Sequence, residues 1–387
     1  MKWGIEPNTG AAAGAMFLLA LGENLWIRFL PKYLEALGAP VLAIGAYGST
    51  EDFLDAVYQY PGGLAGDRYG RRRALLLFIA LAAIGYAIVA VAPAWPVVLV
   101  GMVFVLAWSS MASPTLFAVV GDALPSHRRA LGFSIQSILR RVPIAVAPTI
   151  GGVLIATHGV RGGVRIGLLV AILLACAALL VVRQLHLTPA AAHVPLGVRD
   201  VWRSLPEPLR RLLLSDVFVR TCEGMVDVFL VVYALNVVGI SAPRFGLLIG
   251  LQMVTAIACY LPAARLADRF GRKPFVIATF VAFSLFPVAV VAARGFGGLL
   301  FAYVIGGLRE MGEPARKALI VDLVPPASRA RGVGLYYFVR SLAITPAGLL
   351  GGALWRITPS LPFLVAGSIG LIGTTIFALT VDERVAG

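Results

Sequence analysis

The feature that most constrains this chain is a series of twelve long apolar runs. They cover residues 11–36, 41–65, 73–92, 96–121, 130–157, 162–182, 209–238, 243–264, 274–293, 297–320, 332–355 and 359–381. A helix rises ~1.5 Å per residue, so runs of this length cross the ~30 Å of bilayer hydrocarbon. They lack the strict apolar/polar alternation of barrel strands. The pattern predicts an all-α polytopic membrane protein with 12 transmembrane helices.

Composition excludes the main soluble classes. Hydrophobic residues make up 59% of the 387 residues and charged residues 13%, against roughly 25% charged in soluble domains. A soluble fold of this size cannot bury so much apolar surface. The three cysteines lie in apolar runs without metal-like spacing. We therefore expect neither a cytosolic enzyme, a disulfide scaffold nor a metal site.

The net charge of +14 could indicate nucleic-acid binding, but its placement indicates membrane topology. With the N-terminus in the cytoplasm, 19 Lys and Arg residues fall on the cytoplasmic side and six on the outer side. Short loops rich in basic residues stay inside. We therefore expect no nucleic-acid partner, and a multi-pass protein of the cell inner (cytoplasmic) membrane with both termini cytoplasmic.

The two halves of the chain repeat each other at an offset of 200 or 201 residues. The matching positions include Glu23 and Glu223, Pro114 and Pro314, Asp122 and Asp322, Arg140 and Arg340, and Gly151 and Gly351. Each half holds six runs, so the halves enter the membrane the same way, related by a pseudo-two-fold axis along its normal. We predict an N-terminal bundle at 1–182, a cytoplasmic linker at 183–208 and a C-terminal bundle at 209–387.

The loop after the second run reads Gly63-x-x-x-Asp67-Arg68-x-Gly70-Arg71-Arg72. The loop after the eighth run carries a weaker copy with Asp268, Arg269 and Gly271. Over essentially its whole length the chain resembles transporters of the major facilitator superfamily, whose signature loop joins spans 2 and 3 on the cytoplasmic side. The resemblance implies two six-helix bundles that rock about a central site.

This loop is predicted to gate the transport cycle. Gly70 and Gly271 allow tight turns, and the loop arginines can pair with Asp122 and Asp322 at neighbouring helix ends. Ion pairs that form in just one of two conformers shift the equilibrium between the conformers. The alternative is that the charges of this loop serve only to set the membrane topology.

A second motif, Ala147-Pro148-x-x-Gly151-Gly152, is similar to a signature of drug/proton antiporters within that family. The alternative is a kinked, closely packed membrane helix.

Ionisable residues at bilayer depth are candidates for function, because each costs at least ~2.5–3.5 kcal/mol to insert. The candidates for proton coupling are Glu23, Glu223, Glu51, Asp52 and Asp55. The candidates for substrate binding are Arg140, Arg340, Arg309, Glu310, Glu313, Tyr336, Tyr337, Trp108 and Tyr58. Glu23 has no basic residue three or four positions away, and a buried lone carboxylate favours protonation.

Helical spacing groups several of these charges. Arg309, Glu313 and Arg316 share one helix face. A second face holds Asp216, Arg220, Glu223 and Asp227. Two interpretations remain open: ion pairs that exchange with substrate or protons, or a permanent buried network that only fixes packing.

The leading hypothesis is a proton-coupled secondary active transporter that moves a small amphipathic or charged organic solute by alternating access, with export favoured. We expect it to act as a monomer without a cofactor. The chain has no Walker A sequence for ATP. The alternative is a proton symporter that imports a small organic anion through the same arginines. A third hypothesis is a non-transporting membrane sensor or lipid-handling protein.

Overall fold

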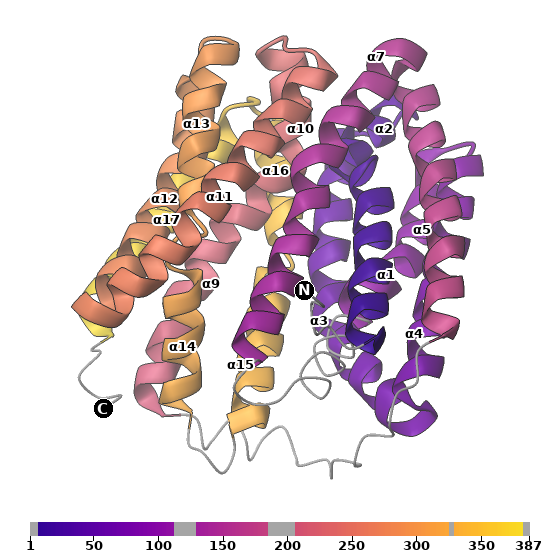
Figure 1. Cartoon of the computed structure of the whole chain (residues 1–387). Helices are drawn as coiled ribbons and strands as arrows, with labels where there is room; N and C mark the ends of the chain where they lie inside the picture. Colours follow the sequence, from indigo (N-terminus) through magenta and orange to yellow (C-terminus); the bar gives the residue numbers. More distant parts are fainter. Residues whose placement is uncertain (1–6, 112–128, 185–205, 325–328, 382–387) are drawn as a thin grey trace. The chain divides into compact units, whose positions relative to one another are not determined.

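The computed structural model describes residues 7–111, 129–184, 206–324 and 329–381. Within these ranges the side chains of 7–10, 12, 59–67, 71, 129–140, 261, 264, 268 and 329–331 are not described. All regular elements in the described ranges are helices, and no strand occurs there (Figure 1). This confirms the predicted all-α class.

Seven helical stretches in the described part of the chain are long and apolar enough to cross a bilayer. They are Ala13–Ala36, Arg72–Val91, Arg141–Arg183, Ala242–Ala267, Lys273–Ala292, Gly332–Trp355 and Leu361–Thr380. The longest of them bends at Gly159, whose φ of 71° is not helical. That bend separates the two runs predicted at 130–157 and 162–182.

Contacts divide the chain into two compact units. The first consists of Met1–Ala39, Val57–Val194 and Ser241–Leu247, and the second of Pro40–Ala56, Pro195–Ile240 and Leu248–Gly387. The helices α3 (Val41–Tyr69) and α11 (Ala242–Phe270) each contribute residues to both units. Most of the predicted linker, 185–205, lies outside the described residues.

The first unit is built around one long, bent helix. Its remaining elements are α1 (Pro7–Asn24), η1 (Ile27–Phe29), α2 (Leu30–Ala36), α4 (Arg71–Val91), α5 (Trp95–Leu106), η2 (Ala107–Met111) and α7 (Arg129–Arg183). The α1 helix packs along α7, and α4 contacts both α5 and α7. Small residues allow the close approach: a Cβ on Gly22 would lie 2.9 Å from the Cα of Ala171.

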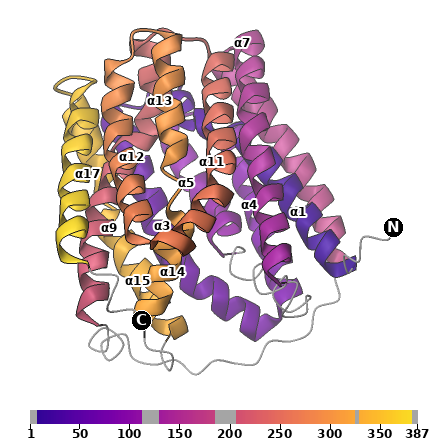
Figure 2. The ribbon, with the colours of Figure 1, turned by 60° about the vertical axis from the view of Figure 1, so that its left-hand side comes forward.

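The second unit has α9 as its hub. Its elements are α9 (Glu207–Val226), η4 (Asp227–Phe229), α10 (Leu230–Val232), η5 (Tyr233–Val237), α12 (Lys273–Ala292), α13 (Phe296–Leu308), α14 (Glu313–Leu323), α15 (Arg329–Ile344), α16 (Ala347–Trp355) and α17 (Leu361–Thr380). The α9 helix contacts α12, α14, α15, α16 and α17, and α12 packs between α13 and α17 (Figure 2). The buried apolar core of this unit includes Leu212, Phe280 and Phe377.

The sequence repeat is visible in the local structure of each unit. A short 3-10 segment begins at Ile27 in the first half and at Asp227 in the second. The 29-residue helices α3 and α11 begin 201 positions apart. Both signature loops turn through a glycine in the left-handed region, Gly70 with φ 82° and Gly271 with φ 91°. A side chain there would strain the backbone, which explains why the turn has glycine in both copies.

Candidate functional site

The candidate site lies in the second unit, where a membrane-spanning segment is broken. The α13 helix ends at Leu308 and α14 begins at Glu313. At the break, the Gly312 N–H donates to the Thr279 hydroxyl at 2.6 Å, and a Cβ on Gly312 would lie 2.3 Å from the Phe275 carbonyl oxygen. Pro314 suits the first turn of the new helix. Glycine and proline therefore set a helix start, with an acid at its first residue, in the middle of an apolar run.

Arg316 is the most buried arginine of the site. Its side chain is 1% exposed. Nη1 donates to Asp216 Oδ2 at 2.6 Å, while Nη2 and Nε donate to the two carboxylate oxygens of Glu313 at 2.8 and 3.1 Å. One guanidinium thus ties α14 to α9 through charge-assisted hydrogen bonds, the strong kind.

Arg220 on α9 joins three carboxylates. Nη1 donates to Glu223 Oε2 at 2.8 Å, Nη2 donates to Glu313, and Nε lies 3.9 Å from Asp216 Oδ1. The guanidinium also lies over the Phe283 ring, 4.8 Å from its centroid. The planar fork of arginine suits such a position, because it presents donors in several directions at once.

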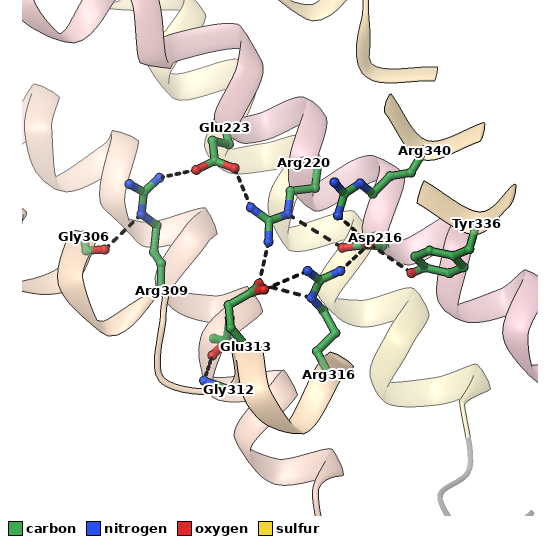
Figure 3. A network of polar contacts seen from close by, with 11 residues as sticks. Asp216, Arg220, Glu223, Gly306, Arg309, Gly312, Glu313, Arg316, Tyr336 and Arg340 are labelled. Carbon is green, nitrogen blue, oxygen red and sulfur yellow. Dashed lines mark hydrogen bonds and ion pairs between the residues drawn. The ribbon is translucent and has the colours of Figure 1, made fainter. Parts of the chain in front are cut away.

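Arg309 occupies one end of the network (Figure 3). Its Nη1 lies 3.4 Å from Glu223 Oε1, and its Nε donates to the Gly306 carbonyl at 3.0 Å. The rings of Phe283 and Phe286 flank the guanidinium at 5.0 and 4.5 Å. The helix break supplies this carbonyl acceptor, and the aromatic rings stabilise the cation.

Arg340 on α15 occupies the other end (Figure 3). Its Nη1 lies 3.6 Å from Asp216 Oδ2, and its guanidinium lies 4.7 Å from the Tyr337 ring centroid. Tyr336 is fully buried and donates its hydroxyl proton to the same Asp216 oxygen at 2.9 Å. Asp216 Oδ2 therefore already accepts two hydrogen bonds, and Arg340 stands just beyond hydrogen-bond distance.

The acids of α3 lie near the Glu223 end of α9. Asp52 Oδ2 would be 3.2 Å from a Cβ added at Gly224. The described charges that act on Asp52 are all carboxylates, those of Glu51, Asp55, Glu223 and Asp227. A group of acids therefore adjoins the arginine-rich network within one unit.

The structure brings most, but not all, of the predicted site residues together. Arg309, Glu313, Tyr336, Tyr337, Arg340, Glu223 and the α3 acids lie in the second unit, and Glu310 lies in the turn between α13 and α14. Three candidates belong to the first unit: Glu23 at the end of α1, Tyr58, whose hydroxyl donates to the Val103 carbonyl at 2.8 Å, and Trp108 in the π-helical turn η2. The Arg140 side chain lies outside the described residues.

The signature loops are described in part. In the second copy Arg272 forms an ion pair with Asp322, joining the loop to the end of α14. Arg269 lies over the ring of its neighbour Phe270, as Arg68 lies over Tyr69 in the first copy. Asp122 and the side chains of Asp67, Arg71 and Asp268 lie outside the described residues. Their gating role stays a prediction.

Three members of the network were not singled out as site residues from the sequence: Asp216, Arg220 and Arg316. Helical spacing placed them on the charged faces, but it gave no reason to prefer them over their neighbours. Their partners on other helices are 93 to 124 positions away in the chain. Only the packing of α14 and α15 against α9 reveals that these three side chains connect the others.

Comparison with known proteins agrees with this architecture. The chain is 24% identical to a chloramphenicol efflux pump of Mycobacterium tuberculosis, with 98% of this chain and 93% of the relative covered. It is 26% identical to the multidrug resistance protein MdtG of Enterobacter lignolyticus over 79% of this chain and 75% of the relative.

Among solved structures, a POT family transporter crystallised with a thioalcohol-conjugated peptide superposes with a TM-score of 0.81 at 14% identity, covering 98% of this chain and 96% of that one. This likeness confirms the predicted fold. Residues 12–237 and 212–387 each match the Major Facilitator Superfamily. The chain therefore belongs to the Major Facilitator Superfamily and is a multi-pass membrane transporter of small molecules, not an enzyme.

Proposed function

We propose that this transporter is a proton-coupled exporter of a small amphipathic or charged organic solute, working by alternating access in the cell inner membrane with both termini cytoplasmic. The observation that carries the proposal is the network of α9, α13, α14 and α15. Burying four arginines and three carboxylates inside the membrane is expensive. Such groups mark substrate and ion pathways in membrane proteins.

Asp52 is the carboxylate that we assign to proton uptake in this unit. Each carboxylate of the network is shared by at least two arginines, whereas the described charges acting on Asp52 are acidic. Carboxylates that share a site favour protonation of one of them. Glu23 in the first unit is the second candidate, as the sequence predicts.

Export is supported by the relatives named for efflux of chloramphenicol and for multidrug resistance. The alternative, uptake of a small organic anion by proton symport, draws on the same arginines. Direction separates the two: resistance of cells that express the protein to a toxic compound favours export, and accumulation of the compound favours uptake.

The test is flux into proteoliposomes that contain the full chain, with chloramphenicol and ethidium as neutral and cationic probes and benzoate as the anionic probe. We expect an imposed pH gradient to drive transport of at least one probe, and collapse of the gradient by an ionophore to abolish net accumulation. If the flux of every transported probe is independent of the pH gradient, proton coupling is refuted. If none of the three probes is transported, the proposal as a whole is refuted.

Asp52→Asn tests the assigned carboxylate. We expect it to lose gradient-driven accumulation while retaining exchange of labelled for unlabelled probe, because exchange requires no net proton movement. Glu207→Gln is the matched control, since Glu207 is 72% exposed in its ion pair with Arg211 at the start of α9. If Asp52→Asn accumulates the probe as the wild type does, Asp52 is not the carboxylate that couples transport to protons. The same test is then applied to Glu23→Gln.

A further inference from the structure

The network of the second unit does not balance its own charge. It contains four guanidinium groups, those of Arg220, Arg309, Arg316 and Arg340, and three carboxylates, those of Asp216, Glu223 and Glu313. Glu310 and Lys317, one acid and one base, act on the same network and offset each other. Among the described members of this network, the guanidinium groups therefore outnumber the carboxylates by one.

The surplus charge belongs to Arg340. The other three arginines each make at least two hydrogen bonds within the network or to the backbone. Arg340 approaches only Asp216, at 3.6 Å, and that oxygen already accepts bonds from Arg316 and Tyr336. Its buried Nε has no hydrogen-bond partner in the described part of the structure; Arg220 Nε has none either, but Arg220 makes two other hydrogen bonds to carboxylates. A buried donor without an acceptor carries a desolvation penalty that a ligand can relieve.

Among the ion pairs of the described residues, that of Arg340 is with Asp216 and not with the acids of α3. Asp52 adjoins Gly224 on α9, and Glu51, Asp55 and Asp227 act on Asp52 electrostatically. Gly224 lies eight residues from Asp216, about 12 Å along the helix. Asp52 therefore adjoins the Glu223 end of the network, whereas the under-satisfied guanidinium of Arg340 approaches Asp216.

We propose that the transported solute carries an anionic group, a carboxylate or its equivalent, and that Arg340 binds this group, with the Tyr337 ring packing beside it. Arg340 presents donors in a fork that matches a carboxylate. Its side chain is 15% exposed, so it is reachable where Arg316, at 1%, is not. This inference rests on the proposed function and narrows it to anionic or zwitterionic solutes.

The experiment measures binding by the purified full chain in detergent, without any flux. The probes share one carbon skeleton: 3-phenylpropionate, 3-phenylpropanamide, 3-phenylpropylamine and phenylalanine. We expect 3-phenylpropionate to raise the Tm in a saturable way, and the amide and amine not to do so. Tighter binding of phenylalanine also supports the site, with its ammonium directed to the acids. An equal response to the amide, a preference for the amine, or no response to the anion up to about 50 mM overturns the proposal.

Variants of Arg340 locate the site. Arg340→Gln is expected to weaken 3-phenylpropionate about ten- to hundredfold, the loss typical of a charged hydrogen bond, and to leave the ligand-free Tm unchanged or higher. Arg340→Lys keeps the positive charge but lacks the planar fork of donors. Its affinity for 3-phenylpropionate should therefore lie between those of the wild type and Arg340→Gln. Arg211→Gln, which alters the exposed pair with Glu207, should bind as wild type does. Undiminished binding by a folded Arg340→Gln protein overturns the assignment.

This result is separable from that of the proposed function. Gradient-driven flux without anion binding would remove only the inference, and anion binding without flux would remove only the transport mechanism.

Discussion

Replacing Arg316 by methionine should be among the most damaging single changes in the second unit. The substitution keeps the apolar length of the side chain and removes three hydrogen bonds, of 2.6, 2.8 and 3.1 Å, to Asp216 and Glu313. Removing one partner of a buried ion pair typically costs 3–5 kcal/mol, because the other charge is left buried. Here Tyr336 still donates to Asp216, and Arg220 still donates to Glu313. We therefore expect a loss of about 3 kcal/mol, the lower end of that range.

The measurement is the free energy of unfolding of purified protein in mixed micelles, titrated with denaturing detergent and followed by tryptophan fluorescence. Arg211→Met is the matched control, because its partner Glu207 is exposed and such a pair contributes only about 0–1 kcal/mol. The double variant Arg316→Met with Glu313→Gln should lose less than the two single changes together, by about 1 kcal/mol or more. If Arg316→Met is no more destabilising than Arg211→Met, the network is not the stabilising element that its geometry indicates.

Three further changes test packing and the loop. Gly45→Val should cost about 1–3 kcal/mol of unfolding free energy, because a Cβ there would lie 2.4 Å from the Gly348 carbonyl oxygen, whereas Gly334→Ala, with open space around it, should cost nothing in the same titration. Asp322→Asn should change the unfolding free energy by less than about 1 kcal/mol, since the ion pair of Asp322 with Arg272 is partly exposed. If this pair gates the transport cycle, the substitution should change the transport rate without changing stability. An unchanged transport rate would mean that these charges only set the membrane topology. Gly271→Ala should lose about 1–2 kcal/mol relative to wild type because its φ of 91° strains a side chain, and an unaffected protein would show that the turn adapts.

Much of the fold follows from the sequence because its causes are local. Run length and apolarity predict membrane helices, and the duplication predicts features seen at matching places, such as the turns at Gly70 and Gly271. The break before Glu313 also has a local cause, since Gly312 and Pro314 flank it. Periodicity alone, however, predicts a continuous helix there, because an apolar run continues on both sides of the break.

The pairing of charges could be predicted only in part, because it depends on the rotation and height of one helix against another. Spacing places Arg316 and Glu313 on one face, and they do bond to each other. It does not reveal that Arg316 reaches Asp216, 100 positions away. Likewise, the sequence predicts Tyr336 as a substrate-binding residue, while the structure shows its hydroxyl bonded to Asp216. Long side chains from three helices meet at points that no single helix specifies.

Arg220 is the group through which events at the two ends of the network would communicate. Its Nη1 bonds to Glu223 near the acids of α3, while its Nε faces Asp216, the carboxylate that Arg340 approaches. Protonation of Asp52 changes the field on Glu223, and an anion that draws Arg340 away changes the field on Asp216. A shared guanidinium then links the two equilibria, and typical coupling between sites changes affinity about 5- to 150-fold.

Arg220→Lys should therefore uncouple the sites while leaving both in place, because an ammonium is a single point charge that cannot serve three carboxylates at once. In wild-type protein we expect the Kd of 3-phenylpropionate to differ about fivefold or more between pH 6 and pH 8, with tighter binding at the lower pH, where fewer acids are charged. In a folded Arg220→Lys protein the ratio of the Kd values at pH 8 and pH 6 should fall toward one. The affinity at either pH alone should be largely kept. An identical pH dependence in both proteins would mean that proton and anion do not communicate through Arg220, because removing the three-way contact would then have left the linkage intact.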